Sequence, residues 1–446
     1  MLNLLKLLKS TMKVLLLSVN VALVFSQATV WAIDEPRVLI ESDNYQLAKY
    51  EPQKGVYLGA YVLQDSTINY DMARFNELTG KKHASFFKYV GYGQPCPEDW
   101  LEDVREVGAV PHIAWEPNDG LDVVQDDTYL RTFARKLKEY GEPVFLRFAS
   151  EMNGDWTAYH GDPEKYIEKW RLVHNVMEEE APNVMMVWTV FTFPQATIME
   201  YYPGDEYVDW VGVNIYNVIY HNNNPKQRAD HEDPLELLDY VYNTFSERKP
   251  IQISEFGATH FTITDNKEYV DFAIAKITRM YEGLKTKYPR VKSIFYFDVN
   301  NLVDGVAGRR INNYAITDNE KILNTYAKLI NNSHYLSEVG ENQEGSYDPE
   351  LFLVQDGVFT NRGTTYISSK VVNKYFGARV AYLQNPKSLV ISKGDKTLSL
   401  PISETPAANA AFIHNGISYL PLRTIASSLG YQIKWSKAEN LIIVTH

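Results

Sequence analysis

The sequence predicts an α/β protein, a (β/α)8 TIM barrel with a small C-terminal α+β repeat domain behind it. Eight short runs of β-branched and aromatic residues lie between Tyr57 and Val299, and stretches with helical spacing separate them. Apolar strands that alternate with helices are typical of a parallel sheet covered by helices. After the eighth run, a polar stretch leads into a segment whose pattern occurs twice.

The eight predicted strands are short and apolar. They begin near Tyr57, Ala84, Val110, Val144, Val184, Trp210, Ile251 and Ser293. A doubly wound open sheet is the structural alternative, but eight units favour closure into a barrel. In such a barrel the chemistry takes place where the strands end.

Helices are predicted between the strands from spacing and end signals. Residues 127–140 have helical spacing and stop at Gly141, a natural C-cap. Asp162 and Pro163 open a second helix that runs to about Glu180. A third helical stretch covers residues 266–288.

The start of the sequence has the order of a secretory signal. Lys6, Lys9 and Lys13 precede an apolar run over residues 14–25, and small residues lead to a cleavage site after Ala32. No cysteine lies near that site, so we expect no lipid anchor. We therefore expect a secreted protein, extracellular or associated with the cell wall.

Composition limits the partners of the protein. The chain has 44 Lys and Arg against 56 Asp and Glu, a net charge of −12. An acidic balance argues against nucleic acid or an anionic membrane as a partner, and it fits an extracellular protein that acts on neutral substrates. We expect the protein to be a monomer. Cys96 is the single cysteine, which excludes an internal disulfide, and we interpret it as a bystander thiol.

Domain boundaries follow from these patterns. We predict a signal peptide over residues 1–32, a barrel domain over 33–330, a polar linker over 331–350 and a repeat domain over 351–446. Each copy of the repeat reads as a short helix, a glycine stop at Gly377 or Gly430, and two strands.

Two glutamates stand at the ends of the fourth and seventh predicted strands. Alternation places Arg147 and Glu151 on one face of the fourth strand, and Glu255 is delivered to the same rim by the seventh. Glycosidic cleavage needs such a pair, because one carboxyl must protonate the leaving oxygen while the other attacks or activates water. Repulsion between the two raises one pKa and makes that group the acid. Arg147 either hydrogen-bonds Glu255 and keeps it ionised or forms a structural ion pair.

The motifs RFASEMNGDW and ISEFG resemble the acid/base and nucleophile motifs of glycoside hydrolase family 26, over residues 57–314. The resemblance implies a retaining endo-β-glycanase without a cofactor, with Glu151 as acid/base and Glu255 as nucleophile. It implies β-mannan, mixed-linkage β-glucan or β-1,3-xylan as substrate. The family's mannanases carry His before the acid/base, whereas this chain has Ser150, which leaves the glucan and xylan open.

Further residues are expected to bind substrate at the rim. By resemblance, Trp156 stacks on sugar, Tyr216 hydrogen-bonds the nucleophile and Tyr296 takes the place of a tryptophan under the −1 sugar. Packing is the alternative for Trp156 and Tyr216. Substrate binding is also expected of Trp115 and Glu116, which end the third strand, and of Asn153 and Asp298, which we place facing the mouth.

The repeat domain resembles the copper amine oxidase N-terminal-like domain. It has no cluster of His or Cys, so we expect no metal there. Attachment to cell wall or polymer and a purely stabilising role are both open. The rival to the enzyme hypothesis is a catalytically inactive barrel that serves as a carbohydrate-binding or cell-wall scaffold protein.

Overall fold

The computed structural model describes residues 37–42, 46–345, 350–354, 356–394, 396–436 and 440–445. The predicted signal peptide lies outside these residues. No helix in the described ranges is long and apolar enough to cross a membrane.

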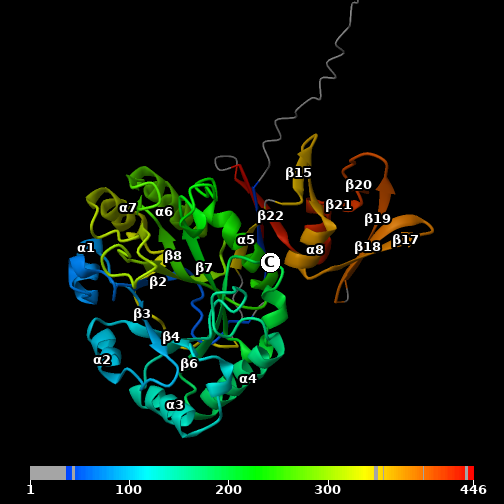
Figure 1. Ribbon diagram of the computed structural model, residues 1–446. Coiled ribbons are helices and arrows are strands. Elements are labelled where there is room, and N and C mark those ends of the chain that lie inside the picture. Colours follow the sequence, from blue (N-terminus) through cyan, green and yellow to red (C-terminus); the bar gives the residue numbers. More distant parts are fainter. Residues whose placement is uncertain are drawn as a thin grey trace, which may run out of the picture. The chain divides into compact units, whose positions relative to one another are not determined.

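Eight parallel strands form the predicted barrel (Figure 1). Each strand pairs with its neighbour along the chain, and the last pairs with the first from Ser293 opposite Tyr57 to Phe297 opposite Tyr61, which closes the ring. The strands are β2 (Val56–Tyr61), β3 (Ser85–Gly91), β4 (Val110–Glu116), β5 (Val144–Phe148), β6 (Val184–Phe191), β7 (Trp210–Asn217), β8 (Ile251–Ala258) and β11 (Val291–Phe297). The short strand β13 (Tyr335–Leu336) pairs with β2 from outside the ring.

Helices surround the ring of strands (Figure 1). They are α1 (Met72–Thr79), α2 (Glu98–Glu106), α3 (Thr128–Tyr140), α4 (Pro163–Glu180), α5 (Pro234–Phe245), α6 (Val270–Leu284) and α7 (Glu320–Ile330). Between β6 and β7 the connection contains the short 3-10 helices η3 (Ile198–Tyr201) and η4 (Asp205–Tyr207) in place of an α-helix.

The capping residues in the sequence predicted the bounds of two of these helices closely. The Asp127 side chain accepts from the backbone N–H of Leu130 at the start of α3, and Gly141 ends it in the left-handed conformation. Asp162 caps α4 in the same way. The third helix is shorter than predicted, because residues 267–268 belong to a hairpin of β9 (Phe261–Thr262) and β10 (Lys267–Glu268) that β12 (Asn312–Asn313) extends.

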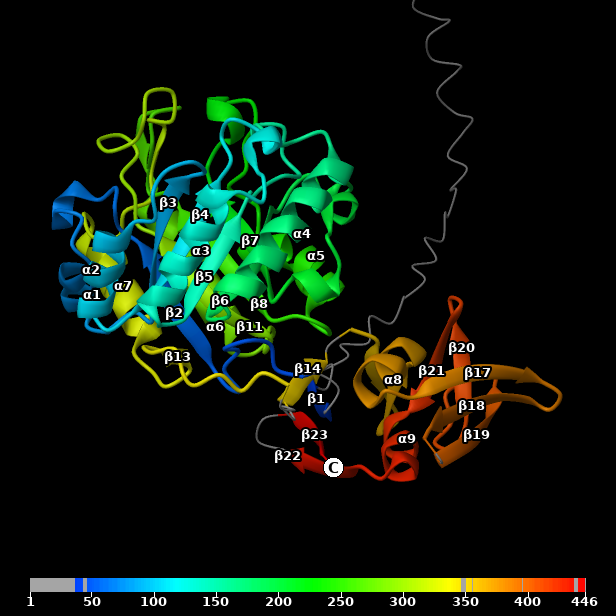
Figure 2. The same cartoon turned by 90° about the horizontal axis from the view of Figure 1, so that it is seen from below.

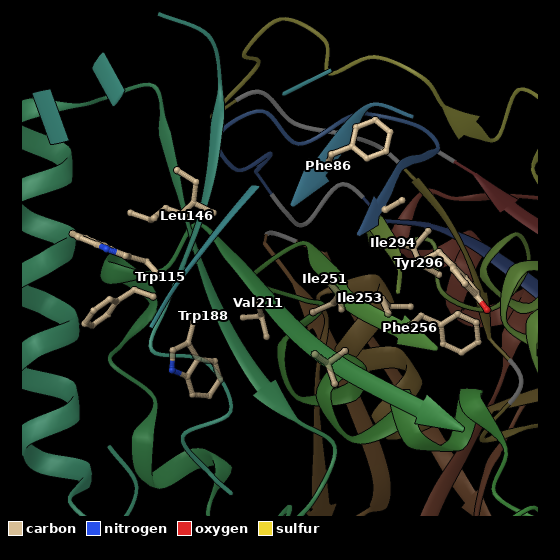
Figure 3. Close-up of a cluster of buried hydrophobic side chains, with 14 of the residues drawn as sticks. Phe86, Trp115, Leu146, Trp188, Val211, Ile251, Ile253, Phe256, Ile294 and Tyr296 are labelled. Carbon is tan, nitrogen blue, oxygen red and sulfur yellow. The ribbon is translucent and has the colours of Figure 1, made fainter. Parts of the chain in front are cut away.

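Buried side chains cover both faces of the barrel strands. Side chains that point outward form one large core cluster with side chains of the helices, and Figure 3 shows Leu146, Trp188, Val211 and Ile253 in this cluster. Inside the ring, a smaller layer of aromatic and aliphatic side chains fills the end where the strands begin. Each large side chain buried in this way stabilises the fold by about 1.5–3 kcal/mol, so the strand ends rest on a rigid base.

The C-terminal residues form sheets and two short helices (Figure 2). One sheet has the order β15 (Val358–Asn361), β16 (Thr364–Ser368), β21 (Ile417–Pro421), β20 (Ala411–His414), β19 (Lys396–Ser403), β18 (Lys387–Lys393) and β17 (Arg379–Gln384). Helices α8 (Ser369–Phe376) and α9 (Leu422–Leu429) end at Gly377 and Gly430, both left-handed, and two strands follow each. The predicted repeat of helix, glycine and two strands is confirmed.

A second sheet joins distant parts of the chain. Strand β1 (Arg37–Ser42) lies between β14 (Glu350–Val354), which is antiparallel to it, and β23 (Leu441–Thr445), which is parallel. Strand β22 (Gln432–Ser436) completes the sheet. The residues just before the barrel therefore pair with strands that follow it.

Candidate active site

Glu151 and Glu255 line one cavity of about 870 Å³. Both stand where barrel strands end: Glu151 follows β5, and Glu255 lies in the second half of β8. A bulge in β8 places Glu255 opposite Asn214 of β7, after Ile253 opposite Val213. The extra residue shifts the alternation by one, so Glu255 points inward although Ile251 and Ile253 point to the helices.

The Glu255 carboxylate accepts three hydrogen bonds. Tyr89 Oη and Arg147 Nη2 each donate to Oε1 at 2.6 Å, and Tyr216 Oη donates to Oε2. Donors to both oxygens favour the ionised form of a carboxylate. Arg147 and Tyr216 thus both hydrogen-bond Glu255, and the contact of Arg147 is at the same time a buried ion pair.

Arg147 is fully buried below the cavity. Burial opposes its charge, but the Glu255 carboxylate holds the pKa of the guanidinium above its usual range. Arg147 Nη1 also donates to Asn214 Oδ1 at 3.3 Å. The site therefore keeps a fixed positive charge beside Glu255 and none in hydrogen-bond contact with Glu151.

Glu151 has a different environment. Asn214 Nδ2 donates to Oε1 and Trp156 Nε1 donates to Oε2, both at 2.7 Å. Burial and the nearby Glu255 charge raise the pKa of Glu151 to about 7, against the lowering effect of the two donors. Glu151 can therefore hold a proton near neutral pH, while Glu255 has the donors of an anion. One carboxyl suits an acid and the other a nucleophile.

Trp156 lies at the cavity, as the sequence predicted. Its side chain is 49% exposed, and its ring meets the edge of Phe191 with centroids 5.1 Å apart. Glu116 also lines the cavity, on the wall beside Ser150. The exposed indole face is available to a sugar ring.

Trp115 and Tyr296 were predicted wrongly as substrate contacts. Trp115 is fully buried and stacks on Phe133 with ring centroids 4.2 Å apart. Tyr296 is also fully buried, and its hydroxyl donates to Tyr314 O at 3.0 Å. Figure 3 shows both rings among the core side chains. Alternation explains the errors, because the cavity is lined by their strand neighbours Glu116 and Phe297.

Asn153 and Asp298 were also wrongly expected to face the mouth. Both are fully buried, and neither lines the cavity. The Asn153 amide exchanges hydrogen bonds with the backbone of Phe191, which holds the segment after β6. Asp298 Oδ1 accepts from Ile316 N at 2.6 Å. These polar side chains hold loops in place.

The sequence analysis missed Tyr89 and Asn214, each of which contacts a candidate catalytic carboxyl. The alternation of side chains along a β-strand, with a period of two residues, could have identified both. Tyr89 stands two residues after Phe87, which packs inside the barrel, and Asn214 stands two residues before Tyr216. Among the residues that the structure describes, no group of three or more His, Cys, Asp or Glu could hold a metal ion.

Two family models match the sequence. The model described as glycosyl hydrolase family 26 matches residues 118–231, which include Glu151, Trp156 and Tyr216. The model described as copper amine oxidase N-terminal domain matches residues 352–444. Both resemblances inferred from the motifs are thus confirmed, and the family 26 match supports a glycoside hydrolase barrel.

Similar proteins carry names of three polysaccharide hydrolases. Endoglucanase H of Acetivibrio thermocellus is 25% identical over 268 residues, which are 56% of this chain and 28% of that protein. Beta-1,3-xylanase TXYA of a Vibrio species is 34% identical over 97 residues, 21% of each chain. Mannan endo-1,4-beta-mannosidase A and B of Caldalkalibacillus mannanilyticus is 24% identical over 166 residues, 35% of this chain and 28% of that protein. The alignments span only 21–28% of these relatives' lengths.

Among solved structures, a family 26 β-mannanase from Bacteroides ovatus is similar. It has 14% sequence identity and a TM-score of 0.46, and the match covers 65% of this chain and 91% of that one.

Proposed function

We propose that this barrel, a glycoside hydrolase with a family 26 match, is a secreted retaining endo-β-glycanase that cleaves its polysaccharide by double displacement. The observation that carries the proposal is the contrast between its two carboxyls. Glu255 accepts three donors, one of them a buried guanidinium, while the pKa of Glu151 is raised to about 7. Retaining cleavage requires this division between an ionised nucleophile and a protonated acid.

In the first step, Glu255 attacks the anomeric carbon as the glycosidic bond breaks. The Glu151 proton passes to the leaving oxygen, which departs as a free hydroxyl. A glycosyl ester on Glu255 remains. In the second step, Glu151, now ionised, takes a proton from water as the water attacks the same carbon and Glu255 leaves. Two displacements at one carbon restore the β configuration.

The donors around the two carboxyls support these steps. Arg147 and Tyr89 both bind Oε1 of Glu255, and Tyr216 binds Oε2, so the carboxylate is held in one orientation during attack. The indole N–H of Trp156 and the amide of Asn214 lower the pKa of Glu151 and so assist the loss of its proton.

The substrate belongs to the β-mannans, mixed-linkage β-glucans or β-1,3-xylans. The named relatives act, by their names, on glucan, xylan and mannan. Ser150 stands before the acid/base where family mannanases carry His, and its hydroxyl is bound to Glu116. An open cavity lined by several loops supports attack within a chain.

The test is release of reducing sugar from mannan, mixed-linkage glucan, β-1,3-xylan and β-1,3-glucan. Wild type is expected to hydrolyse at least one, and Glu255→Ala none. Proton NMR of the first-formed product should show the β-anomer. The α-anomer first would refute Glu255 as nucleophile, and an inert wild type that still binds a polymer would favour a carbohydrate-binding scaffold.

We also propose that the C-terminal domain attaches the enzyme to cell wall or polymer. Sedimentation of inactive Glu255→Ala with insoluble polysaccharide, with and without soluble oligosaccharide to occupy the cavity, tests this proposal. Binding that survives the oligosaccharide supports it, and complete displacement refutes it.

A further inference from the structure

The turn that carries Glu151 has an unusual backbone. Ala149 and Glu151 both have positive φ, 45° and 60°, and neither is glycine. A left-handed residue of this kind costs about 1–3 kcal/mol and persists only where its surroundings determine it. The turn therefore needs contacts that hold it.

The backbone changes partners within this turn. Ala149 N donates to Trp115 O of β4, and two residues later Glu151 N donates to Thr189 O of β6, each at 3.0 Å. Ser150 stands between these bonds, outside the regular pairing of β5 with either neighbour. The conformation at Ser150 sets where the Glu151 side chain starts.

Glu116 and Tyr159 bind every polar atom of Ser150. Glu116 accepts from Ser150 Oγ at 2.5 Å and from Ser150 N at 3.1 Å. Tyr159 Oη lies 2.5 Å from Ser150 O and 2.6 Å from Glu116 Oε2. Tyr166 Oη donates to Ala149 O at 3.0 Å. We call Glu116 and Tyr159 the clamp.

The clamp binds both oxygens of the Glu116 carboxyl to the turn. Ser150 Oγ donates to Oε1, and Ser150 N and Tyr159 Oη both donate to Oε2. Tyr159 Oη also donates to Ser150 O, so its hydroxyl links the Glu116 carboxyl to the backbone carbonyl of the turn.

The surroundings of Glu116 act on the pKa of its carboxyl in opposite directions. Burial raises the pKa of its carboxyl, against Arg147 from β5 and the hydrogen bonds of Ser150 and Tyr159, which lower it. Tyr159 and Tyr166, the other titratable groups in this contact region, have pKa values well above the usual range, chiefly because of burial, and remain donors.

We propose that Glu116 is a positioning residue that, together with Tyr159, fixes the turn at Ser150 and thereby aims the Glu151 proton at the glycosidic oxygen. The inference rests on the proposed function and adds a third carboxyl to it. It replaces the expectation that Glu116 binds sugar directly.

The test compares two leaving groups. An unmodified oligosaccharide that the enzyme cleaves needs a proton from Glu151, whereas its 2,4-dinitrophenyl glycoside does not. Glu116→Ala and Tyr159→Phe should lower kcat/KM on the oligosaccharide by about 100-fold, the usual range for a misplaced general acid. On the dinitrophenyl glycoside kcat/KM should change less than about 3-fold, because acid assistance is not needed.

Glu116→Gln is the conservative variant. Its carboxamide oxygen can accept from Ser150 N and Tyr159 Oη while its NH2 group donates to Ser150 Oγ, so it should retain kcat/KM on the oligosaccharide within about 10-fold of wild type. Tyr288→Phe is the matched control, because it removes a buried hydroxyl that donates to Leu235 O and Asp239 Oδ1 of α5, away from the turn. An equal loss on both substrates, or a Gln variant as impaired as Ala, would overturn the proposal.

A crystal structure of Glu116→Ala separates this inference from the proposed function. If wild type cleaves nothing in the polysaccharide panel, the function fails, but the structure still tests the clamp. Loss of positive φ at Ala149 or Glu151 supports it. An unchanged turn would overturn it.

Discussion

Glu151→Gln should change how the stability of the protein depends on pH. The folded protein holds the pKa of Glu151 at about 7, against an ordinary value of 4.5. Between these values the folded state binds a proton that the unfolded state has lost, so the free energy of unfolding falls as pH rises. A difference of about 2.5 pH units corresponds to about 3.5 kcal/mol at about 1.4 kcal/mol for each unit, of which about 3 kcal/mol is lost between pH 4.5 and pH 8.

Glutamine does not titrate, so the variant lacks this loss. From pH 4.5 to pH 8, the stability of the variant relative to wild type should rise by about 3 kcal/mol. The entropy of unfolding is roughly 2.1 cal/mol/K per residue. Dividing the relative gain of about 3 kcal/mol by this entropy, summed over residues 46–345, predicts that Tm rises by about 5 °C relative to wild type. The glutamine amide also faces two hydrogen-bond donors, Asn214 and Trp156, which lowers the free energy of unfolding by an amount that does not vary with pH.

The assay is differential scanning calorimetry of both proteins across this pH range. Glu164→Gln, at the exposed start of α4, is the matched control for a change of charge and should follow wild type. Parallel curves of Tm against pH for wild type and Glu151→Gln would refute the raised pKa and, with it, the assignment of the acid.

Three further outcomes are expected. Tyr216→Phe removes a hydrogen bond to the nucleophile carboxylate and should lower kcat/KM by about 10- to 100-fold, since hydrogen bonds to charged groups are worth about 1.5–3 kcal/mol; full activity would contradict this role. Trp156→Phe removes a donor that favours the ionised acid/base, so the alkaline limb of the kcat/KM profile should move to higher pH, and a limb that moves down would be inconsistent with it. Glu51→Gln breaks a fully buried ion pair with Arg290 and should lower the free energy of unfolding by about 3–5 kcal/mol in calorimetry. The kcat at 25 °C should not change, because the two residues precede the first and last barrel strands, at the end of the barrel opposite the cavity.

The barrel was predictable because its signals are local. Eight apolar runs and cap residues such as Asp127 and Gly141 follow from the sequence pattern alone. The hairpin at residues 261–268 was missed, because its two-residue strands depend on pairing with β12 rather than on their own pattern.

The site shows where alternation is sufficient and where it fails. Arg147 and Glu151 share a face by period two, and the same count would have excluded Trp115 and Tyr296 and included Tyr89. Glu255 is different, because the bulge in β8 reverses its side. Strict alternation would have turned this carboxyl toward the helices, and the motif rather than the period identified it.

The pairing of strand β1 depends on strands that are synthesised after the barrel. Strand β1 leaves the ribosome before the barrel, but its two partners, β14 and β23, are made only after the barrel is complete. Until then a strand that will bury Val38 and Ile40 has both edges free, a state prone to mispairing. Truncation has the same consequence: an isolated barrel that ends before residue 350 should also begin after residue 42, or it will carry an apolar strand with no sheet to join.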